Sequence, residues 1–317
     1  MFLRNNKKSK ILLPGGAGLV GQNLVAFLKR KGYLNLVVLD KHRANLNVLQ
    51  SMHPDIKIEY ADLAVPGAWG KHFEGADAVV MLQAQIGDLH AEPFVRNNLT
   101  TTTVIIELIK KYNIPYTVQI SSSVVTSVAD DHYTHTKRAQ EEMVLASGIN
   151  CVVLRPTLMF GWFDRKHLGW LSRFMKKVPV FPIPGHGRYM RQPLYVGDFC
   201  AIIISCLESG ISGKVFNITG LEEIFYVDII RQIKKATNSR CQIVSIPYAL
   251  FSLLLRSWAL FDRDPPFTAS QLKALTAGDE FEVIEWPAIF GVKPTPFAKA
   301  IDETFNDPEY SKVKLEF

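Results

Sequence analysis

Short apolar runs alternate along the first half of the chain with stretches whose apolar positions recur every three to four residues. The apolar runs lie at residues 11–13, 36–39, 56–60, 78–82, 116–120 and 151–154. The stretches with helical periodicity lie between them, at about 19–31, 94–112 and 134–147. Strands that are continuously apolar and alternate with helices are typical of a parallel sheet covered on both faces. The pattern therefore predicts an α/β fold with a doubly wound, Rossmann-type parallel sheet.

The alternation of strands and helices is interrupted after Pro156. Residues 161–192 are rich in glycine and proline, and we expect a loop-rich insertion over the active cleft. A helix at about 197–209 and a strand at 215–218 return to the sheet, and the rest of the chain predicts helices broken by prolines. We therefore predict an NAD-binding domain, residues 1–160 with 190–220, and a smaller substrate-binding region, residues 161–189 and 221–317.

Composition and charge narrow the class of protein. Hydrophobic residues make up 48% and charged residues 21% of the chain, as in an ordinary globular protein. The net charge of +6 suits a phosphate-bearing ligand, but the sequence has no nucleic-acid-reading motif. The four cysteines have no CxxC spacing, which indicates buried thiols in a reducing compartment and no metal site. Without a secretory leader or a run of about 18 apolar residues, we expect a cytoplasmic protein with no transmembrane segment.

A glycine-rich loop follows the first strand and opens the first helix. Its spacing is G-x-x-G-x-x-G, and it provides Gly15, Gly18, Leu19, Val20 and Gly21. Glycines at such a turn let the backbone approach a pyrophosphate, whose charge the start of the helix favours. Asp40 ends the second strand and can accept hydrogen bonds from the adenosine ribose, which favours NAD over NADP. Lys41 and Arg43 follow directly and soften this preference.

A second motif offers acid–base chemistry. Tyr133 and Lys137 stand four residues apart, on one face of a predicted helix. An ammonium at that distance lowers the pKa of a phenol, so that the phenol can exchange a proton near neutral pH. Ser121, Ser122 and Ser123 follow the preceding strand, where ligands of doubly wound sheets bind. These residues together predict a site for hydride and proton transfer at a hydroxyl or keto carbon.

The order of these motifs resembles the extended short-chain dehydrogenases/reductases, specifically the NAD-dependent epimerase/dehydratase family. The resemblance runs from Ile11 to about Gly220 and rests on motifs in a fixed order. These are the glycine loop, Asp40, Asp62-Leu63, Ala84-Gln85, Asn98, the three serines, Tyr133-x-x-x-Lys137, Leu154-Arg155-Pro156 and the segment Gln192–Asp198.

The resemblance implies roles for individual residues. Ser123 would be the catalytic hydroxyl, with Ser122 as the alternative if the match is displaced by one residue. Tyr133 would be the acid/base, and Lys137 would bind the nicotinamide ribose. Further cofactor contacts are implied for Asp62 and Leu63 beside the adenine, for Ala84, for Ser121 and for Pro156, while Asn98 would steady the site. Ser122, Ser123 and Arg191 would contact the substrate, with Arg191 on a diphosphate, and a homodimer is implied.

The chain departs from the family pattern in two places and leaves the reaction open. Pro14 replaces a usual threonine, and the loop between Ser123 and Tyr133 is short. Val124 follows the serines where the dehydratases of this family have an acid, which disfavours dehydration. We therefore expect an epimerase or a ketoreductase/dehydrogenase, with a nucleotide sugar as the substrate. The alternatives are a non-catalytic NAD(P)-binding scaffold subunit and an enzyme of a lipid- or sterol-like substrate. The second is suggested by the apolar stretch 246–261, where Arg256 and Trp258 could contact a membrane surface.

Overall fold

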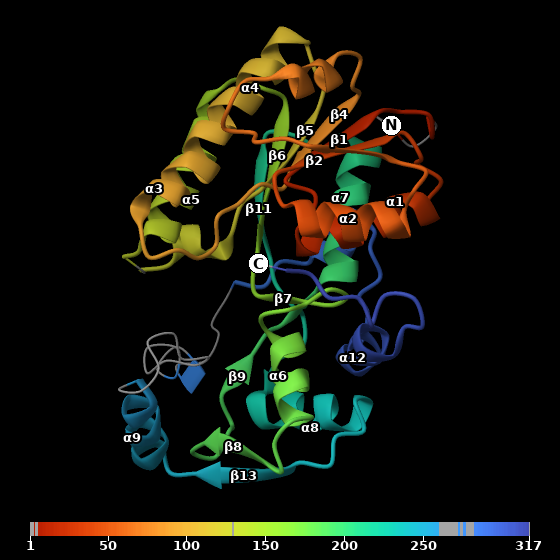
Figure 1. Cartoon of the computed structure of the whole chain (residues 1–317). Helices are drawn as coiled ribbons and strands as arrows, with labels where there is room; N and C mark the ends of the chain where they lie inside the picture. Colours follow the sequence, from red (N-terminus) through yellow and green to blue (C-terminus); the bar gives the residue numbers. More distant parts are fainter. Residues whose placement is uncertain are drawn as a thin grey trace.

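A seven-stranded parallel sheet forms the centre of the larger lobe in this computed structural model (Figure 1). The structure describes residue 3 and residues 6–128, 130–259, 272, 275–276 and 282–316. The strands of the sheet are β1 Ile11–Pro14, β2 Leu36–Asp40, β3 Lys57–Tyr60, β4 Ala78–Met81, β5 Thr117–Ile120, β6 Cys151–Pro156 and β11 Lys214–Ile218. Their order is β11-β6-β5-β4-β1-β2-β3, and all neighbouring strands are parallel. This confirms the predicted doubly wound sheet.

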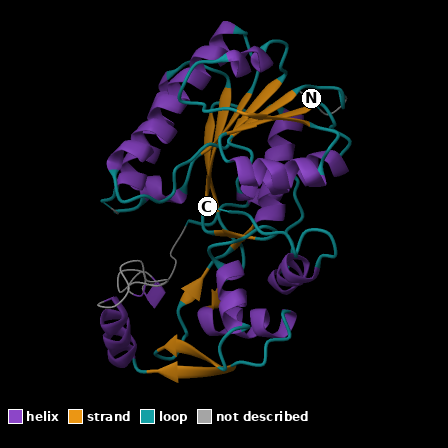
Figure 2. Cartoon of the chain, viewed as in Figure 1, coloured by secondary structure: helices purple, strands orange, loops and turns teal. Residues whose placement is uncertain are grey.

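Helices cover both faces of the sheet (Figure 2). On one face lie α1 (Leu19–Arg30) and α7 (Val196–Ser209), and on the other α4 (Thr101–Lys111) and α5 (His132–Ala146). The remaining elements of this lobe are α2 Arg43–Met52, α3 Ala91–Phe94, a π-helical turn Val95–Thr100 and two 3₁₀ helices, Ala68–Phe73 and Ser123–Thr126.

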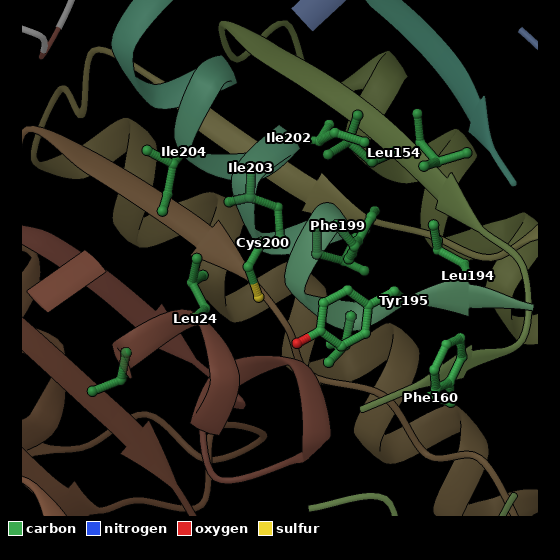
Figure 3. Packing of buried hydrophobic residues seen from close by; sticks show 14 of the residues in the cluster. Leu24, Leu154, Phe160, Leu194, Tyr195, Phe199, Cys200, Ile202, Ile203 and Ile204 are labelled. Carbon is green, nitrogen blue, oxygen red and sulfur yellow. The ribbon is translucent and has the colours of Figure 1, made fainter. Parts of the chain in front are cut away.

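Residues that alternate along the strands pack into opposite layers. Ile11 and Leu13 belong to the cluster that α1 and α7 complete, and Leu12 belongs to the cluster on the other face. Figure 3 shows the first layer, in which Leu24 of α1 lies near Cys200 of α7. All four cysteines are free and buried, as the sequence predicts, and burial raises the pKa of the Cys200 thiol well above its usual value.

The smaller lobe contains more regular structure than its composition suggests. Its helices are α6 Leu168–Met175, α8 Tyr226–Ala236, α9 Tyr248–Ala259, α11 Trp286–Phe290 and α12 Phe297–Asn306. Its strands pair two by two: β7 Met159–Phe160 with β10 Leu194–Tyr195, β9 Met190–Arg191 with β12 Ile224–Phe225, and β8 Val180–Pro184 with β13 Gln242–Ile246. The expectation of a loop-rich insertion at 161–192 is therefore wrong in part. Glycine and proline mark the turns there, while α6 and β8 bury apolar side chains between them.

The end of the chain returns to the larger lobe. Asn45 of α2 exchanges two hydrogen bonds with the backbone of Glu316, Nδ2 to O at 2.9 Å and N to Oδ1 at 2.7 Å. Tyr310 is buried against Trp162, with their ring centroids 4.7 Å apart. Part of the range predicted for the substrate-binding region thus packs on the nucleotide domain. The division of the chain into two functional regions stays a proposal.

Candidate active site

The glycine loop contains one open position between two tightly packed ones. Gly15 has a φ of +79°, and a Cβ there would overlap the backbone of Gln83. A Cβ on Gly21 would overlap the carbonyl oxygen of Gly16. At Gly18 the nearest atom to an added Cβ would be 3.9 Å away. Gly15 and Gly21 therefore let the loop and α1 pack closely, while Gly18 leaves an exposed hollow at the start of the helix.

The start of α1 has the properties of an anion site. Gly18 caps the helix without a side-chain hydrogen bond, and the first turn has no acidic residue. The adjoining side chains of Leu19 and Val20 are half-buried. Asp40 lies beside the loop, where its Oδ2 accepts from the backbone N–H of Ala17 at 3.0 Å. A pyrophosphate fits the exposed N–H groups, and a ribose fits the carboxylate that borders them.

The predicted adenine side of the site includes a residue that sequence reasoning missed. Arg96 binds both carboxylate oxygens of Asp62, at 3.1 and 2.6 Å, and this pairing lowers the pKa of that carboxyl. Leu63 is buried beside it, and Ala84 is exposed after β4. Arg96 stands two positions before Asn98, but nothing in its local sequence indicates a partner 34 residues away.

The structure pairs Tyr133 with Ser122 and not with Ser123. Tyr133 lies at the start of α5, where Asp131 caps the helix through the N–H of Thr134 at 2.7 Å. Burial raises the pKa of Tyr133, while a hydrogen bond with the Ser122 side chain acts in the opposite direction. Ser123 begins the 3₁₀ helix, and its carbonyl accepts from Thr126. Of the two serines that the sequence offered, Ser122 is therefore the one that contacts Tyr133, and the assignment of the catalytic hydroxyl to Ser123 or Ser122 stays a prediction.

Lys137 lies one helical turn after Tyr133 and is fully buried. Its Nζ donates to the carbonyl of Ile120 at 3.0 Å and to Oε1 of Gln140 at 2.5 Å. Burial lowers the pKa of Lys137 to about 7, against the charge of Glu141. The expected lowering of the Tyr133 pKa by Lys137 is therefore not found, because the ammonium is held by other acceptors and the phenol is itself desolvated.

Asn98 is a positioning residue in the structure. Its Oδ1 accepts from the N–H of Gln85 at 2.7 Å, and its Nδ2 donates to Oγ1 of Thr136 at 2.9 Å. Because Asn98 is fully buried, it ties the loop after β4 to α5 and does not face a ligand. Thr102 extends this network, since its Oγ1 accepts from Gln140 at 2.9 Å.

Ser121 and Pro156 are both buried at the carboxyl ends of their strands, and their predicted cofactor contacts stay predictions. Ser121 is buried and donates to Oε2 of Glu141 at 2.5 Å. Glu141 in turn forms an ion pair with Arg155, which precedes the buried Pro156 at the end of β6. These residues fix the carboxyl ends of β5 and β6, the edge from which the site is built.

Cationic side chains of the smaller lobe lie opposite the loop after β4. Arg191 lies on β9. Burial lowers the pKa of His167, and the charges of Lys166 and Arg191 lower it further. A Cβ added to Gly87, in the loop after β4, would lie 4.0 Å from the Nζ of Lys166. The loop of the nucleotide domain and the cationic segment of the smaller lobe therefore face each other.

Two hollows among the described residues lie elsewhere. They measure ≈ 140 and ≈ 410 Å³ and adjoin at Tyr195, Asp198 and Thr295, between α7 and the α12 region. None of the serines, nor Tyr133 or Lys137, lines them. Their polar groups bind one another, as Asp198 accepts from Thr295 at 2.6 Å and Tyr195 donates to Glu303 at 2.8 Å. We therefore locate the site by its chemistry, at the carboxyl edge of the sheet.

Comparison with known proteins gives concordant matches. The model of the NAD dependent epimerase/dehydratase family matches residues 11–219. A dTDP-glucose 4,6-dehydratase of Streptomyces niveus is 26% identical over 270 residues, which cover 74% of this chain and 80% of that protein. A mitochondrial NADH dehydrogenase [ubiquinone] 1 alpha subcomplex subunit 9 of Dictyostelium discoideum is 25% identical over 81% of this chain and 73% of its own.

Solved structures share the fold across nearly the whole chain. The UDP-glucuronic acid 4-epimerase of Bacillus cereus, a structure in complex with NAD, superposes with a TM-score of 0.74 at 19% identity. The match covers 94% of this chain and 97% of that one. The smaller lobe therefore belongs to the shared architecture as well as the sheet.

Proposed function

The chain belongs to the NAD-dependent epimerase/dehydratase family, and from this premise we propose that it is an NAD-dependent epimerase or ketoreductase/dehydrogenase of a nucleotide sugar. The observation that carries the proposal is the pairing of Ser122 with Tyr133 at the same sheet edge as the open glycine hollow at Gly18. A homodimer that pairs through α4 and α5 is part of the proposal.

In the proposed reaction the side chains hold the reacting hydroxyl and move its proton. Ser122 Oγ and Tyr133 Oη bind the hydroxyl or keto oxygen, and Tyr133 removes or returns the proton. NAD, when bound at Gly18 and Asp40, supplies the acceptor or donor of the hydride. Lys137, which is hydrogen-bonded to the carbonyl of Ile120 at the end of β5, would bind the nicotinamide ribose.

The cationic side of the cleft supports a substrate with phosphate groups. Arg191, Lys166 and His167 come from the segment that faces the loop after β4. We propose that they bind the diphosphate of a nucleotide sugar, with Arg191 as the main contact. Dehydratases are among the relatives, but dehydration remains disfavoured in this proposal. Val124 and Val125 follow the serines and provide no acid, and the carboxylate of Asp131 already caps α5.

The proposal is tested by substitution of Tyr133→Phe in the full-length protein. We expect kcat to fall by about 10²–10⁴-fold on UDP- or dTDP-sugars, because the proton acceptor is lost, while the dissociation constant for NADH stays the same. NADH fluorescence measures binding, and NMR of the sugar products measures turnover. Release of bound NAD on denaturation would favour the epimerase, in which the cofactor is retained between turnovers.

The two serines provide a matched pair for this experiment. Ser122→Ala should lower kcat and move the basic limb of the pH–rate profile upward, because its hydrogen bond opposes the raised pKa of Tyr133. Ser123→Ala should change kcat by less than about threefold, which corresponds to on the order of 0.6 kcal/mol. It should leave the pH–rate profile where it is in the wild type. Equal losses for the two variants would contradict the assignment of Ser122.

A second candidate function is a non-catalytic NAD(H)-binding subunit of a larger assembly. Its support is the similarity to the Dictyostelium subunit and the hydrogen bonds that hold Lys137 to Ile120 and Gln140. Under this alternative, Tyr133→Phe would leave the cellular role intact, and no sugar in the screen would be converted.

A further inference from the structure

Two neighbouring elements of the smaller lobe expose apolar side chains. Strands β8 and β13 form a two-stranded sheet whose outward residues include Val180 and Val244, both exposed. Helix α9 follows β13 directly and exposes Leu250, Leu253 and Leu254, which share one helical face by their spacing. Leu253 is 60% exposed. We call these five residues the apolar edge.

Positive charge accompanies the apolar edge. Residues 165–191 and 229–257, which supply α6, β8, most of α8, β13 and most of α9, contain twelve Lys and Arg and no Asp or Glu. Since the whole chain has a net charge of +6, the remaining residues carry an excess of acids. These two segments therefore carry a local excess of positive charge, which is bordered by Asp164 and Asp228.

Three of these cations lie near the start of β8 and β13, at the end of the apolar edge that is farther from α9. Lys176 and Lys177 follow α6, and Arg240 precedes β13. The two segments are joined by a hydrogen bond of 2.7 Å from Ser239 Oγ to the carbonyl of Met175. Because β8 and β13 are parallel, these residues lie where both strands begin, and α9 starts where β13 ends. Figure 1 shows β13 and α9 along the end of the molecule farthest from the central sheet.

We propose that the apolar edge and its flanking cations bind the surface of an anionic lipid bilayer. Leucines on α9 would enter the interface, while lysines and arginines would contact the phosphate headgroups. Within the described residues no helix is long and apolar enough to cross a membrane, so α9 would lie in the interfacial plane. Trp258, which the sequence suggested for such a contact, lies outside the residues whose side chains are described.

Charge favours a bilayer over a second copy of the chain. A symmetric dimer through this face would bring two equally cationic surfaces together, whereas anionic headgroups neutralise them. The larger lobe would remain away from the bilayer, since it lies at the other end of the molecule (Figure 1). The proposal does not depend on the enzymatic function proposed above.

The test is co-sedimentation of the full-length protein with vesicles. We expect binding to vesicles of phosphatidylcholine mixed with phosphatidylglycerol, weak binding to phosphatidylcholine alone, and loss of binding at high salt. Leu253→Ser/Leu254→Ser and Lys176→Glu/Lys177→Glu should each lower the partition coefficient by about tenfold or more. Circular dichroism and NADH binding verify that each variant is folded.

Matched controls come from the larger lobe. Leu34 is 56% exposed, and Lys110 and Lys111 end α4 as Lys176 and Lys177 follow α6. Leu34→Ser and Lys110→Glu/Lys111→Glu should leave the partition coefficient unchanged. Absence of binding to anionic vesicles at low salt, or equal losses in the control variants, would overturn the proposal. A dimer in analytical ultracentrifugation that Leu253→Ser/Leu254→Ser dissociates would also overturn it, because a second copy then covers this face.

Discussion

At the scale of single residues, burial sets the chemistry of the predicted pair Tyr133 and Lys137. The phenol loses solvation and its pKa rises, while the pKa of the ammonium falls to about 7. Both shifts disfavour the charged forms that acid–base catalysis uses. The sequence predicts which residues meet at the site, but the protonation state of each depends on how many protein atoms surround it.

The low pKa of Lys137 makes the stability of the protein depend on pH. Between pH 7 and about 10 the unfolded chain holds a proton on this side chain that the folded protein lacks, so stability rises with pH. We therefore expect the free energy of unfolding to increase with pH more in the wild type than in Lys137→Met. The difference should reach on the order of a few kcal/mol over this range. Urea unfolding at several pH values measures it.

The control for this measurement is Lys110→Met, at an exposed position on α4. It should reproduce the pH dependence of the wild type. A difference between wild type and Lys137→Met that stays constant from pH 7 to 10 would show that Lys137 is not desolvated.

At the scale of elements, α5 explains how a short loop can follow β5. Arg138 on α5 donates from Nε to the carbonyl of Val125 at 2.8 Å and also binds the carbonyl of Ser127. The 3₁₀ turn Ser123–Thr126 supplies these carbonyls next to the helix. Arg138 therefore holds the part of the loop up to Ser127 against α5, and the short loop still allows the contact of Ser122 with Tyr133.

The glycine loop gives a prediction in which two similar substitutions act differently. Gly18 has a φ of −81° and open space, so Gly18→Ala should fold with little change in Tm but bind NADH more weakly, since the methyl group occupies the anion hollow. Gly21→Ala should destabilise the protein by about 1–3 kcal/mol, because its Cβ meets the backbone of Gly16. Thermal unfolding and NADH titration separate the two effects. A large loss of stability in Gly18→Ala would contradict this description of the loop.

At the scale of the whole molecule, the end of the chain joins the two lobes. Tyr310 packs on Trp162 and Phe163, while Trp162 also stacks on Phe27 of α1. Arg30 lies over the rings of Trp162 and Tyr310, with its guanidinium 4.8 Å from the first centroid. The segment after α12 thus completes an aromatic cluster that is formed by both lobes.

This cluster predicts a stability defect far from the chemical site. Tyr310→Ala should lower the free energy of unfolding by about 3–5 kcal/mol, because a buried aromatic ring is replaced by a cavity. Tyr60→Ala, at an exposed position on β3, serves as the control and should cost less than about 1 kcal/mol. Similar losses for both variants, measured by urea unfolding, would argue against docking of the end of the chain.

The sequence by itself determined the sheet and the place of the candidate site residues along it. Apolar runs spaced by helical periodicity specify parallel strands, and the glycine loop, the serines and Tyr133 follow strands whose carboxyl ends share one edge. Local patterns are sufficient here because each signal lies within one element or at its end.

Only the tertiary structure decided the contacts between distant elements. The pairing of Ser122, the direction of Lys137 toward Gln140 and the ion pair of Arg96 with Asp62 depend on how helices and loops pack. The return of residues 307–316 to α2 likewise joins segments that are far apart in the chain. Such contacts arise from the shape and desolvation of the assembled fold, which no local pattern of residues encodes.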